Sequence, residues 1–195
     1  MKTLSTLAMA AAVAVILPTS SALAGETYVV DPAHAWVQFG IGHAGWSTAR
    51  GKFSAIEGTI DFDKDDVTKS SVEITIDATS VDTNLEARDD HLLGPDFLNV
   101  EEFPEVTFNS TSIEQTGERT ALVTGDMTMI GATREVVLDV TWNNEAALPW
   151  DATTIVSGFS ATTSFNPVDF GMNKVAEFGL GPMMDVIIEV ESQKQ

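Results

Sequence analysis

Alternation of apolar and polar residues with period two constrains the fold of this chain more than any other feature. The clearest runs cover residues 37–41, 56–62, 72–76, 136–142 and 186–190, and weaker runs cover residues 106–113, 121–130 and 155–165. Successive side chains of a strand point to opposite faces of a sheet, so each run predicts a strand with one buried and one solvated face.

Turn-forming residues separate these runs. They lie at residues 63–66, at residues 116–118, at Gly131 and at Asn143-Asn144. About eight strands with short connections predict an all-β fold, either a sandwich or a closed antiparallel barrel. No repeat or linker divides the chain, so we expect one domain over residues 25–195.

The first 24 residues have the features of a secretory signal peptide. Lys2 precedes an apolar run over residues 4–17, and Ala22-Leu23-Ala24 has the small-x-small pattern of a cleavage site. The apolar run is shorter than the ~20 residues that a membrane-spanning helix needs. We therefore expect cleavage after Ala24 and export of a mature chain that starts at Gly25.

Charge and cysteine content restrict the partners and the chemistry. The formal net charge is −19, from 29 acidic and 10 basic residues, and the sequence contains no cysteine. Such an acidic protein repels nucleic acids and anionic membranes, so we expect neither a nucleic-acid partner nor stable membrane insertion. Thiol catalysis and thiolate-bound metals are excluded, and a homodimer remains open.

Residues 83–103 contain the one segment that is typical of a helix. Thr83 and Glu86 match the capping-box pattern at a helix start, and Gly94-Pro95 predicts the end, with the glycine in a left-handed conformation. The fold class that follows is all-β with a short helical insertion.

An arginine lies on the apolar face of this predicted helix. At about 100° per residue Leu85, Arg88 and Leu92 share one face, with His91 at its edge. A buried arginine needs a partner, solvent or an anionic ligand. Either Arg88 pairs with a nearby aspartate or caps a strand end, or Arg88 and His91 hold a polar head group at the mouth of an apolar cavity, with residues 96–103 as a lid.

The same segment resembles the signature region of the YceI family. The matching runs include SVDTN at residues 80–84, RDDHL at 88–92, DFLNV at 96–100 and TFNSTS at 107–112. Further matches are HAWVQF at residues 34–39, GTIDFD at 58–63, GDMTMIGAT at 125–133 and DFGMN at 169–173. They occur in order over nearly the whole mature chain.

The resemblance implies a lipocalin-like barrel in the periplasm that binds a long isoprenoid lipid, of polyprenyl or quinone type, without catalysis. We assign ligand binding to polar residues at the cavity mouth and to an apolar wall: His43, Arg88, His91, Phe39, Leu92, Phe97, Phe108, Met127, Met129 and Phe170. Family members often carry a cation at the positions of Leu93 and of Asn166 or Pro167. These replacements favour an uncharged head group, and we expect no metal and no cofactor besides the lipid.

A second hypothesis is a periplasmic enzyme, or a haem- or metal-dependent protein, that uses His43 and His91. The three histidines do not have the spacing of a common metal motif, and no nucleophile elbow or phosphate-binding loop occurs. This hypothesis therefore depends on the fold bringing His43 and His91 together.

Overall fold

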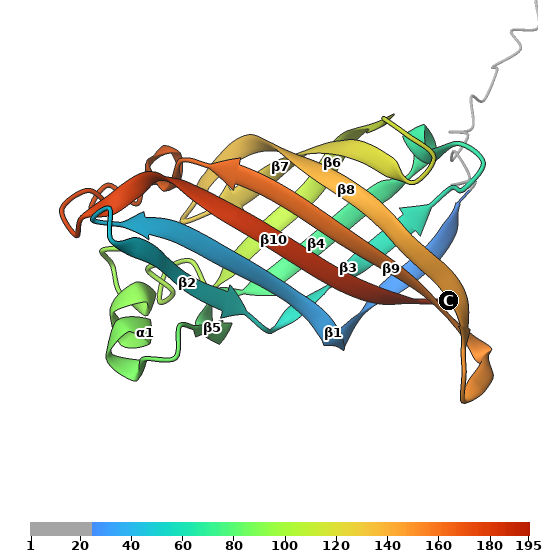
Figure 1. The fold of residues 1–195 in the computed structure, drawn as a ribbon, viewed down its shortest axis with the longest axis horizontal. Helices are drawn as coiled ribbons and strands as arrows, with labels where there is room; N and C mark the ends of the chain where they lie inside the picture. Colours follow the sequence, from blue (N-terminus) through green and yellow to red (C-terminus); the bar gives the residue numbers. More distant parts are fainter. Residues whose placement is uncertain (1–24) are drawn as a thin grey trace, which may run out of the picture.

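The structure is a computed structural model that describes residues 25–195, so the predicted signal peptide lies outside the described residues. In this part of the chain one antiparallel sheet closes into a barrel, and a single short α-helix lies at one of its ends (Figure 1). The predicted fold class, an all-β barrel with a short helical insertion, is confirmed.

Within residues 25–195, ten strands and four helical segments follow one another. The strands are β1 (Glu26–His43), β2 (Ser47–Phe53), β3 (Ile56–Phe62), β4 (Ser71–Asp77), β5 (Val81–Asp82), β6 (Glu105–Gln115), β7 (Thr120–Met129), β8 (Ala132–Leu148), β9 (Asp151–Phe165) and β10 (Leu180–Lys194). The α-helix is α1 (Glu86–Leu93), and the 3₁₀ helices are η1 (Val67–Lys69), η2 (Ala78–Ser80) and η3 (Pro167–Phe170).

These ten strands occupy eight positions around the barrel. β2 and β3 lie end to end along one edge of β1, since β3 pairs with residues 26–29 of β1 and β2 with residues 37–43. β5 continues β4 in the same way, because β4 pairs with β3 while β5 pairs with β2. Pairing of β10 with the other edge of β1 closes the barrel and leaves no long free edge.

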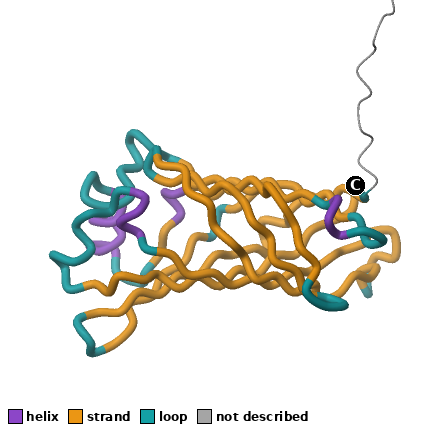
Figure 2. Tube along the Cα trace, turned by 90° about the horizontal axis from the view of Figure 1, so that it is seen from above, coloured by secondary structure: helices purple, strands orange, loops and turns teal. Residues whose placement is uncertain are grey.

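The helical segments gather at the ends of the barrel. Figure 2 shows strands along the middle, several helical segments at one end and one at the other. Gly131, in the turn between β7 and β8, contacts Phe103 from the loop after α1. The β7–β8 turn therefore lies at the end that carries α1, which we call the α1 end, and the β6–β7 turn lies at the opposite end.

The turn predicted at Asn143-Asn144 is wrong. β8 continues to Leu148, and only a register shift between Trp142 and Asn144 marks the position. Asn144 pairs with Gly158 of β9, and the Asn143 side chain donates to Ser160 Oγ at 2.8 Å. Pairing along the long β8–β9 hairpin outweighs the local turn preference of asparagine.

The predicted caps of α1 are also wrong. The helix begins after Leu85 without a side-chain cap, because the Thr83 hydroxyl donates to Asp89 Oδ1 at 2.5 Å instead. Gly94 is extended, with φ −74° and ψ 175°, so it does not adopt the left-handed conformation. The helix still ends where predicted, since Pro95 prevents the preceding residue from continuing it.

Apolar side chains on the inner face of the sheet form two clusters. One lies towards the α1 end and includes Phe97, Phe108 and Phe170, and the other lies towards the opposite end and includes Tyr28 and Phe62. Many inward side chains between them, such as Ile74, Leu138 and Ile188, are only half-buried although they point away from bulk solvent. The interior is therefore hollow.

Candidate functional site

The hollow interior is a long cavity with almost entirely apolar walls. The centre of a water-sized molecule can reach about 270 Å³ of it, and every strand position around the barrel contributes to the lining. Lining residues of β10 run from Leu180 to Val190. This span is about 33 Å along the strand and, at a tilt of about 40°, about 25 Å along the barrel axis.

These dimensions match a single hydrocarbon chain. Spread over that length, the volume corresponds to a tube about 6–7 Å wide once the radius of water is added. Non-bonded carbon atoms approach to about 4 Å, so the tube admits one chain with methyl branches but not two chains side by side. The methionines Met127, Met129, Met172 and Met184 lie in the wall and can adapt their shape to a ligand.

The α1 end of the cavity is closed by apolar side chains. Leu92 comes from α1, Phe97 and Leu98 follow it, and Met172 and Val175 come from the connection between η3 and β10. Four of the five are buried, and Leu92 is half-buried. Residues 92–98 therefore cover this end, and of the lid expected over residues 96–103 only Phe97 and Leu98 line the cavity.

The opposite end opens to solvent. Of the described residues that line the cavity, the exposed ones are Gln115, Gly117, Glu118 and Arg119, all at the β6–β7 turn. We call this opening the mouth. Val67 of η1 and Ser70, the residue that follows η1, also border it. The sequence predicted the mouth beside Arg88 and His91, and the structure places it at the other end of the barrel.

A cation lies at the mouth. The Arg119 guanidinium is 5.2 Å from the centre of the Trp142 ring, which itself lines the cavity, and its Nη1 donates to the Asn143 carbonyl at 2.7 Å. The Trp142 indole N–H donates to Ser157 Oγ at 3.1 Å, which fixes the ring. This cation–π pair places a positive group against the polar rim of an apolar tube.

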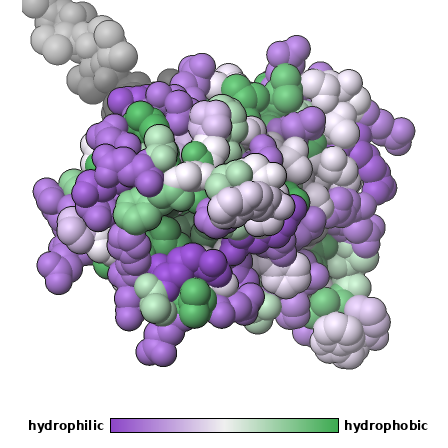
Figure 3. Space-filling view, turned by 60° about the vertical axis from the view of Figure 1, so that its left-hand side comes forward, coloured by the Kyte–Doolittle hydropathy of each residue, from purple (hydrophilic) through white to green (hydrophobic). Residues whose placement is uncertain are grey.

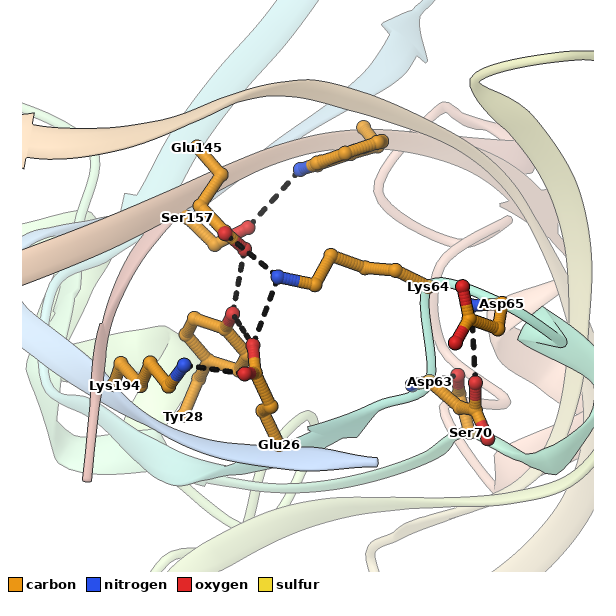
Figure 4. Close-up of polar contacts among 10 residues, drawn as sticks. Glu26, Tyr28, Asp63, Lys64, Asp65, Ser70, Glu145, Ser157 and Lys194 are labelled. Atoms are coloured by element: carbon orange, nitrogen blue, oxygen red, sulfur yellow. Dashed lines mark hydrogen bonds and ion pairs between the residues drawn. The ribbon is translucent and has the colours of Figure 1, made fainter. Parts of the chain in front are cut away.

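A network of charged groups lies at the same end as the mouth. Figure 4 shows Glu26, Tyr28, Lys64, Glu145 and Lys194 pointing toward one another. Lys64 Nζ is 2.8 Å from carboxylate oxygens of both glutamates, and the buried Tyr28 hydroxyl donates to Glu145 at 2.5 Å and to Glu26 at 3.0 Å. Lys194 pairs with Glu26 and so ties the last strand to the first.

The pKa values in this network follow from its contacts. Hydrogen bonds from Lys194 and then Lys64 lower the pKa of Glu26 to about 2. Burial, followed by the hydrogen bond to Glu145, raises the pKa of Tyr28 well above its usual range, so the hydroxyl remains a donor. Burial alone would raise the pKa of Glu145, but hydrogen bonds from Lys64 and Tyr28 outweigh it and lower that pKa.

The structure places the sequence-predicted site residues in different environments. Six of the seven apolar ones line the cavity: Phe39, Leu92, Phe97, Phe108, Met127 and Met129. Phe170 does not line it, because it is buried behind the wall with its ring 5.3 Å from that of Phe165. The three polar ones, His43, Arg88 and His91, lie outside the lining.

Arg88 is exposed and not part of an apolar stripe. Its Nε donates to Thr83 Oγ1 at 2.7 Å, and its Nη2 donates to the Thr83 carbonyl at 2.6 Å. Leu85, predicted on the same buried face, is 53% exposed. These contacts match the first of the two interpretations, in which Arg88 caps the end of a strand, here β5. Its contact with a ligand stays a prediction.

The two histidines of the enzyme hypothesis make separate aromatic contacts. The His43 ring lies 6.0 Å from Trp46, whereas His91 lies 5.1 Å from Phe97 and 5.0 Å from Phe178. Within residues 25–195 no group of three or more His, Cys, Asp or Glu side chains could hold a metal ion. The structure keeps the two histidines in separate contacts, and His91 packs on Phe97, one of the residues that cover the α1 end.

The sequence reasoning missed the residues of the mouth. Arg119 and Glu118 are the charged residues among the described cavity lining. A signal was available, since a chain with only 10 basic residues contains a cation in the turn 116–119 between two apolar strands. The same scarcity of cations drew attention to Arg88, but the strand pattern does not tell which cation faces the interior.

The outer surface is mainly polar. Seen with the α1 end turned forward, hydrophilic residues cover most of it, with hydrophobic residues in patches between them (Figure 3). Trp46 and Trp150, in two hairpin turns, are 83% and 81% exposed. None of the helices in residues 25–195 is long and apolar enough to cross a membrane.

The chain is similar in sequence to known bacterial proteins. The YceI-like domain matches residues 28–192. A "UPF0312 protein" of Pseudomonas savastanoi pv. phaseolicola is 38% identical over 173 residues, which cover 88% of this chain and 87% of that protein.

Two solved structures have the same fold. The crystal structure of Burkholderia cenocepacia BcnA matches with a TM-score of 0.73 and 20% identity, over 83% of this chain and 98% of that one. A polyisoprenoid binding domain from Saccharophagus degradans, implicated in plant cell wall breakdown, matches with a TM-score of 0.62 and 13% identity, over 88% and 99% of the two chains. At these identities the likeness concerns the fold.

Proposed function

The chain belongs to the YceI-like family, and from this premise and the shape of its cavity we propose that it binds one isoprenoid lipid inside the barrel. The observation that carries the proposal is an apolar tube, one hydrocarbon chain wide, that runs along the barrel and opens at one end. A soluble ligand with polar groups along its length would lose its hydrogen bonds with water there, whereas a hydrocarbon chain gains about 0.8 kcal/mol for each buried CH₂ group.

The ligand class is an isoprenoid lipid of polyprenyl or quinone type. The fold neighbour from Saccharophagus degradans is a polyisoprenoid binding domain, which supports an isoprenoid ligand here by analogy of fold. Methyl branches fit a wall built from phenylalanine, methionine and branched aliphatic side chains, since such residues fill irregular spaces. The proposed role is binding without catalysis, and its support is that the two charged residues of the described lining, Glu118 and Arg119, both lie at the mouth.

The place of action is the periplasm. The support is the amino-terminal sequence, with Lys2, an apolar run and a cleavage pattern at Ala24. The periplasmic fraction of a bacterium that expresses the full chain should contain a protein whose mass corresponds to a start at Gly25. Recovery of the uncleaved chain in the cytoplasm would contradict this placement.

Lipid extraction is the direct test of the function. The protein is purified from the periplasm without detergent, extracted with organic solvent, and the extract is analysed by mass spectrometry. We expect about one isoprenoid lipid per chain. Metal and haem content are measured on the same sample. A barrel that carries no lipid and does not take one up when mixed with isoprenoid lipids, or one that carries stoichiometric metal, would refute the proposal.

A further inference from the structure

We infer that the lipid enters tail first between the β6–β7 turn and η1, and that Arg119 and Gln115 hold an uncharged, hydrogen-bonding head group there, at the end opposite to α1. This inference rests on the proposed function and adds the direction of the ligand and the chemistry of its head. Four observations lead to it, namely exposure, the distribution of polar groups, the geometry of Arg119 and the balance of charge.

Exposure fixes the direction of entry. The exposed residues of the described lining belong to the β6–β7 turn, while the α1 end is covered by Leu92, Phe97 and Leu98. Behind these residues the His91 ring packs on Phe97, and Phe97 also contacts Phe178 at a ring distance of 5.5 Å. A ligand entering at the α1 end would have to displace this packed layer, whereas exposed side chains of the β6–β7 turn border the mouth.

The polar groups of the lining fix the place of the head. Gln115, Glu118, Arg119 and Thr120 lie together at the mouth, whereas the side chains that cover the α1 end are apolar. Thr107 and Thr163 are the lining threonines nearest to that end, and the Thr163 hydroxyl already donates to the Val137 carbonyl. Burying a polar head at the covered end would cost its hydrogen bonds with water without replacing them. The tail therefore points to α1, and the head remains at the mouth.

Arg119 has the geometry of a head-group donor. Its guanidinium lies over the Trp142 ring at the cavity wall, and one of its five N–H groups donates to the Asn143 carbonyl. Gln115 lies on the same rim, where its Nε2 donates to the Gly117 carbonyl at 3.0 Å. The N–H groups of Arg119 beyond that one bond can donate to carbonyl or ether oxygens of a ligand head.

The charge at the mouth selects an uncharged head. Arg119 and its neighbour Glu118 are the charged residues of the described lining, and their charges cancel. Among residues 25–195 the other cations at this end are already paired: Lys64 with Glu26 and Glu145, Lys69 with Asp66, and Lys194 with Glu26. A pyrophosphate head would place several negative charges beside Glu118 with a single cation to balance them.

The route of entry is tested with a bulky label. Because the sequence has no cysteine, Glu118→Cys and Leu85→Cys each provide one labelling site, at the mouth and at the α1 end. Both are reacted with a large maleimide, and uptake of the apolar fluorophore N-phenyl-1-naphthylamine is followed by stopped flow. We expect the label at position 118 to slow uptake by about tenfold or more and the label at position 85 to change it less than about twofold.

The position of the head is tested by quenching of a single tryptophan. Trp36, Trp46 and Trp150 lie outside the cavity lining and are replaced by Phe, so that Trp142 is the only reporter. In a second protein Trp142→Phe is combined with Leu92→Trp, which moves the reporter to the covered end. Decylubiquinone, whose quinone head quenches indole at short range, should quench Trp142 strongly and the reporter at position 92 weakly.

The chemistry of the head is tested with two probes of equal tail. Decylubiquinone should bind the native chain at least about tenfold more tightly than decyl phosphate, and Arg119→Met should weaken the quinone complex by about tenfold, as expected for a lost hydrogen bond to a charged donor. Tighter binding of decyl phosphate would overturn the assignment of an uncharged head.

The outcomes separate this inference from the proposed function. If the native barrel takes up neither N-phenyl-1-naphthylamine nor decylubiquinone, the proposed function itself fails. If it takes up both, but the label at position 85 slows uptake or the reporter at position 92 is the quenched one, the function stands and the inferred direction is refuted.

Discussion

Filling the middle of the tube should abolish lipid binding without unfolding the protein. Ala161 is buried, lines the cavity and pairs with Val140 and Ile188 on the neighbouring strands. An apolar cavity of about 150 Å³ holds one benzene, so the phenyl ring of Ala161→Phe occupies about half of the 270 Å³ available here. About six ligand carbons lose their place, which corresponds to about 4–5 kcal/mol and at least a thousandfold in Kd.

The stability of the same variant should change little or increase. Burial of the added ring contributes up to about 2 kcal/mol, and local overpacking costs about 1 kcal/mol. Urea unfolding of the delipidated protein measures this change, and lipid extraction followed by mass spectrometry measures occupancy. Loss of lipid with an unchanged or higher free energy of unfolding is the expected combination.

A matched control is available one residue along the strand. Thr162 is exposed on the outer face of β9, so Thr162→Phe adds the same ring outside the barrel and should retain the lipid. The reasoning is refuted if Ala161→Phe keeps native occupancy, or if Thr162→Phe loses it to the same extent.

Three further predictions concern the frame of the barrel. A Cβ on Gly125 would lie 2.4 Å from the Phe108 ring and 2.6 Å from a backbone oxygen, so Gly125→Ala should lower the free energy of unfolding in urea by about 1–3 kcal/mol, while Gly181→Ala, with nothing closer than 3.6 Å, should have little effect. The pKa of Glu26 is lowered from 4.5 to about 2. The ionised Glu26 carboxylate therefore contributes fully to the free energy of unfolding above pH 4.5, and this contribution is lost as the pH falls towards 2. Glu26→Gln should therefore destabilise the protein in urea at neutral pH and have little effect near pH 2; an equal effect at both would contradict the network. Arg88→Ala removes two hydrogen bonds to Thr83 and should increase hydrogen exchange in α1 with unchanged lipid occupancy. Lower occupancy with unchanged exchange would instead support the head-group role predicted from the sequence.

The local pattern of the sequence predicted the strands well and their ends poorly. Alternation identified the inward side of β3, β4 and β10, because the period of a strand does not depend on its partners. It missed the extension of β8 past Asn144, where pairing with Gly158 overrides a local turn preference. It also missed that the Thr83 hydroxyl donates a hydrogen bond to Asp89 instead of capping α1. Either arrangement gives the hydroxyl a hydrogen-bond partner, so the sequence does not distinguish them.

The candidate site was predicted in part for a similar reason. The apolar wall residues Phe39, Phe108 and Met127 follow from strand parity, which the sequence contains. Which end of the barrel is open depends instead on how the α1 segment packs, and no single strand carries that information. The cation at the mouth, Arg119, was therefore overlooked in favour of Arg88.

The sequence by itself determined that this chain forms half-buried strands, that they make an antiparallel sheet with a short helical insertion, and that the family motifs lie on it in order. These properties depend on the spacing of residues along the chain. The family resemblance implied a barrel of about eight strands with an apolar pore, and only the tertiary structure decided that Phe97 and Leu98 cover one end and that Arg119 lies at the other. The reason is physical: alternation fixes which side chains face inward, whereas the space left between them depends on closure and register, which residues far apart in the chain set together.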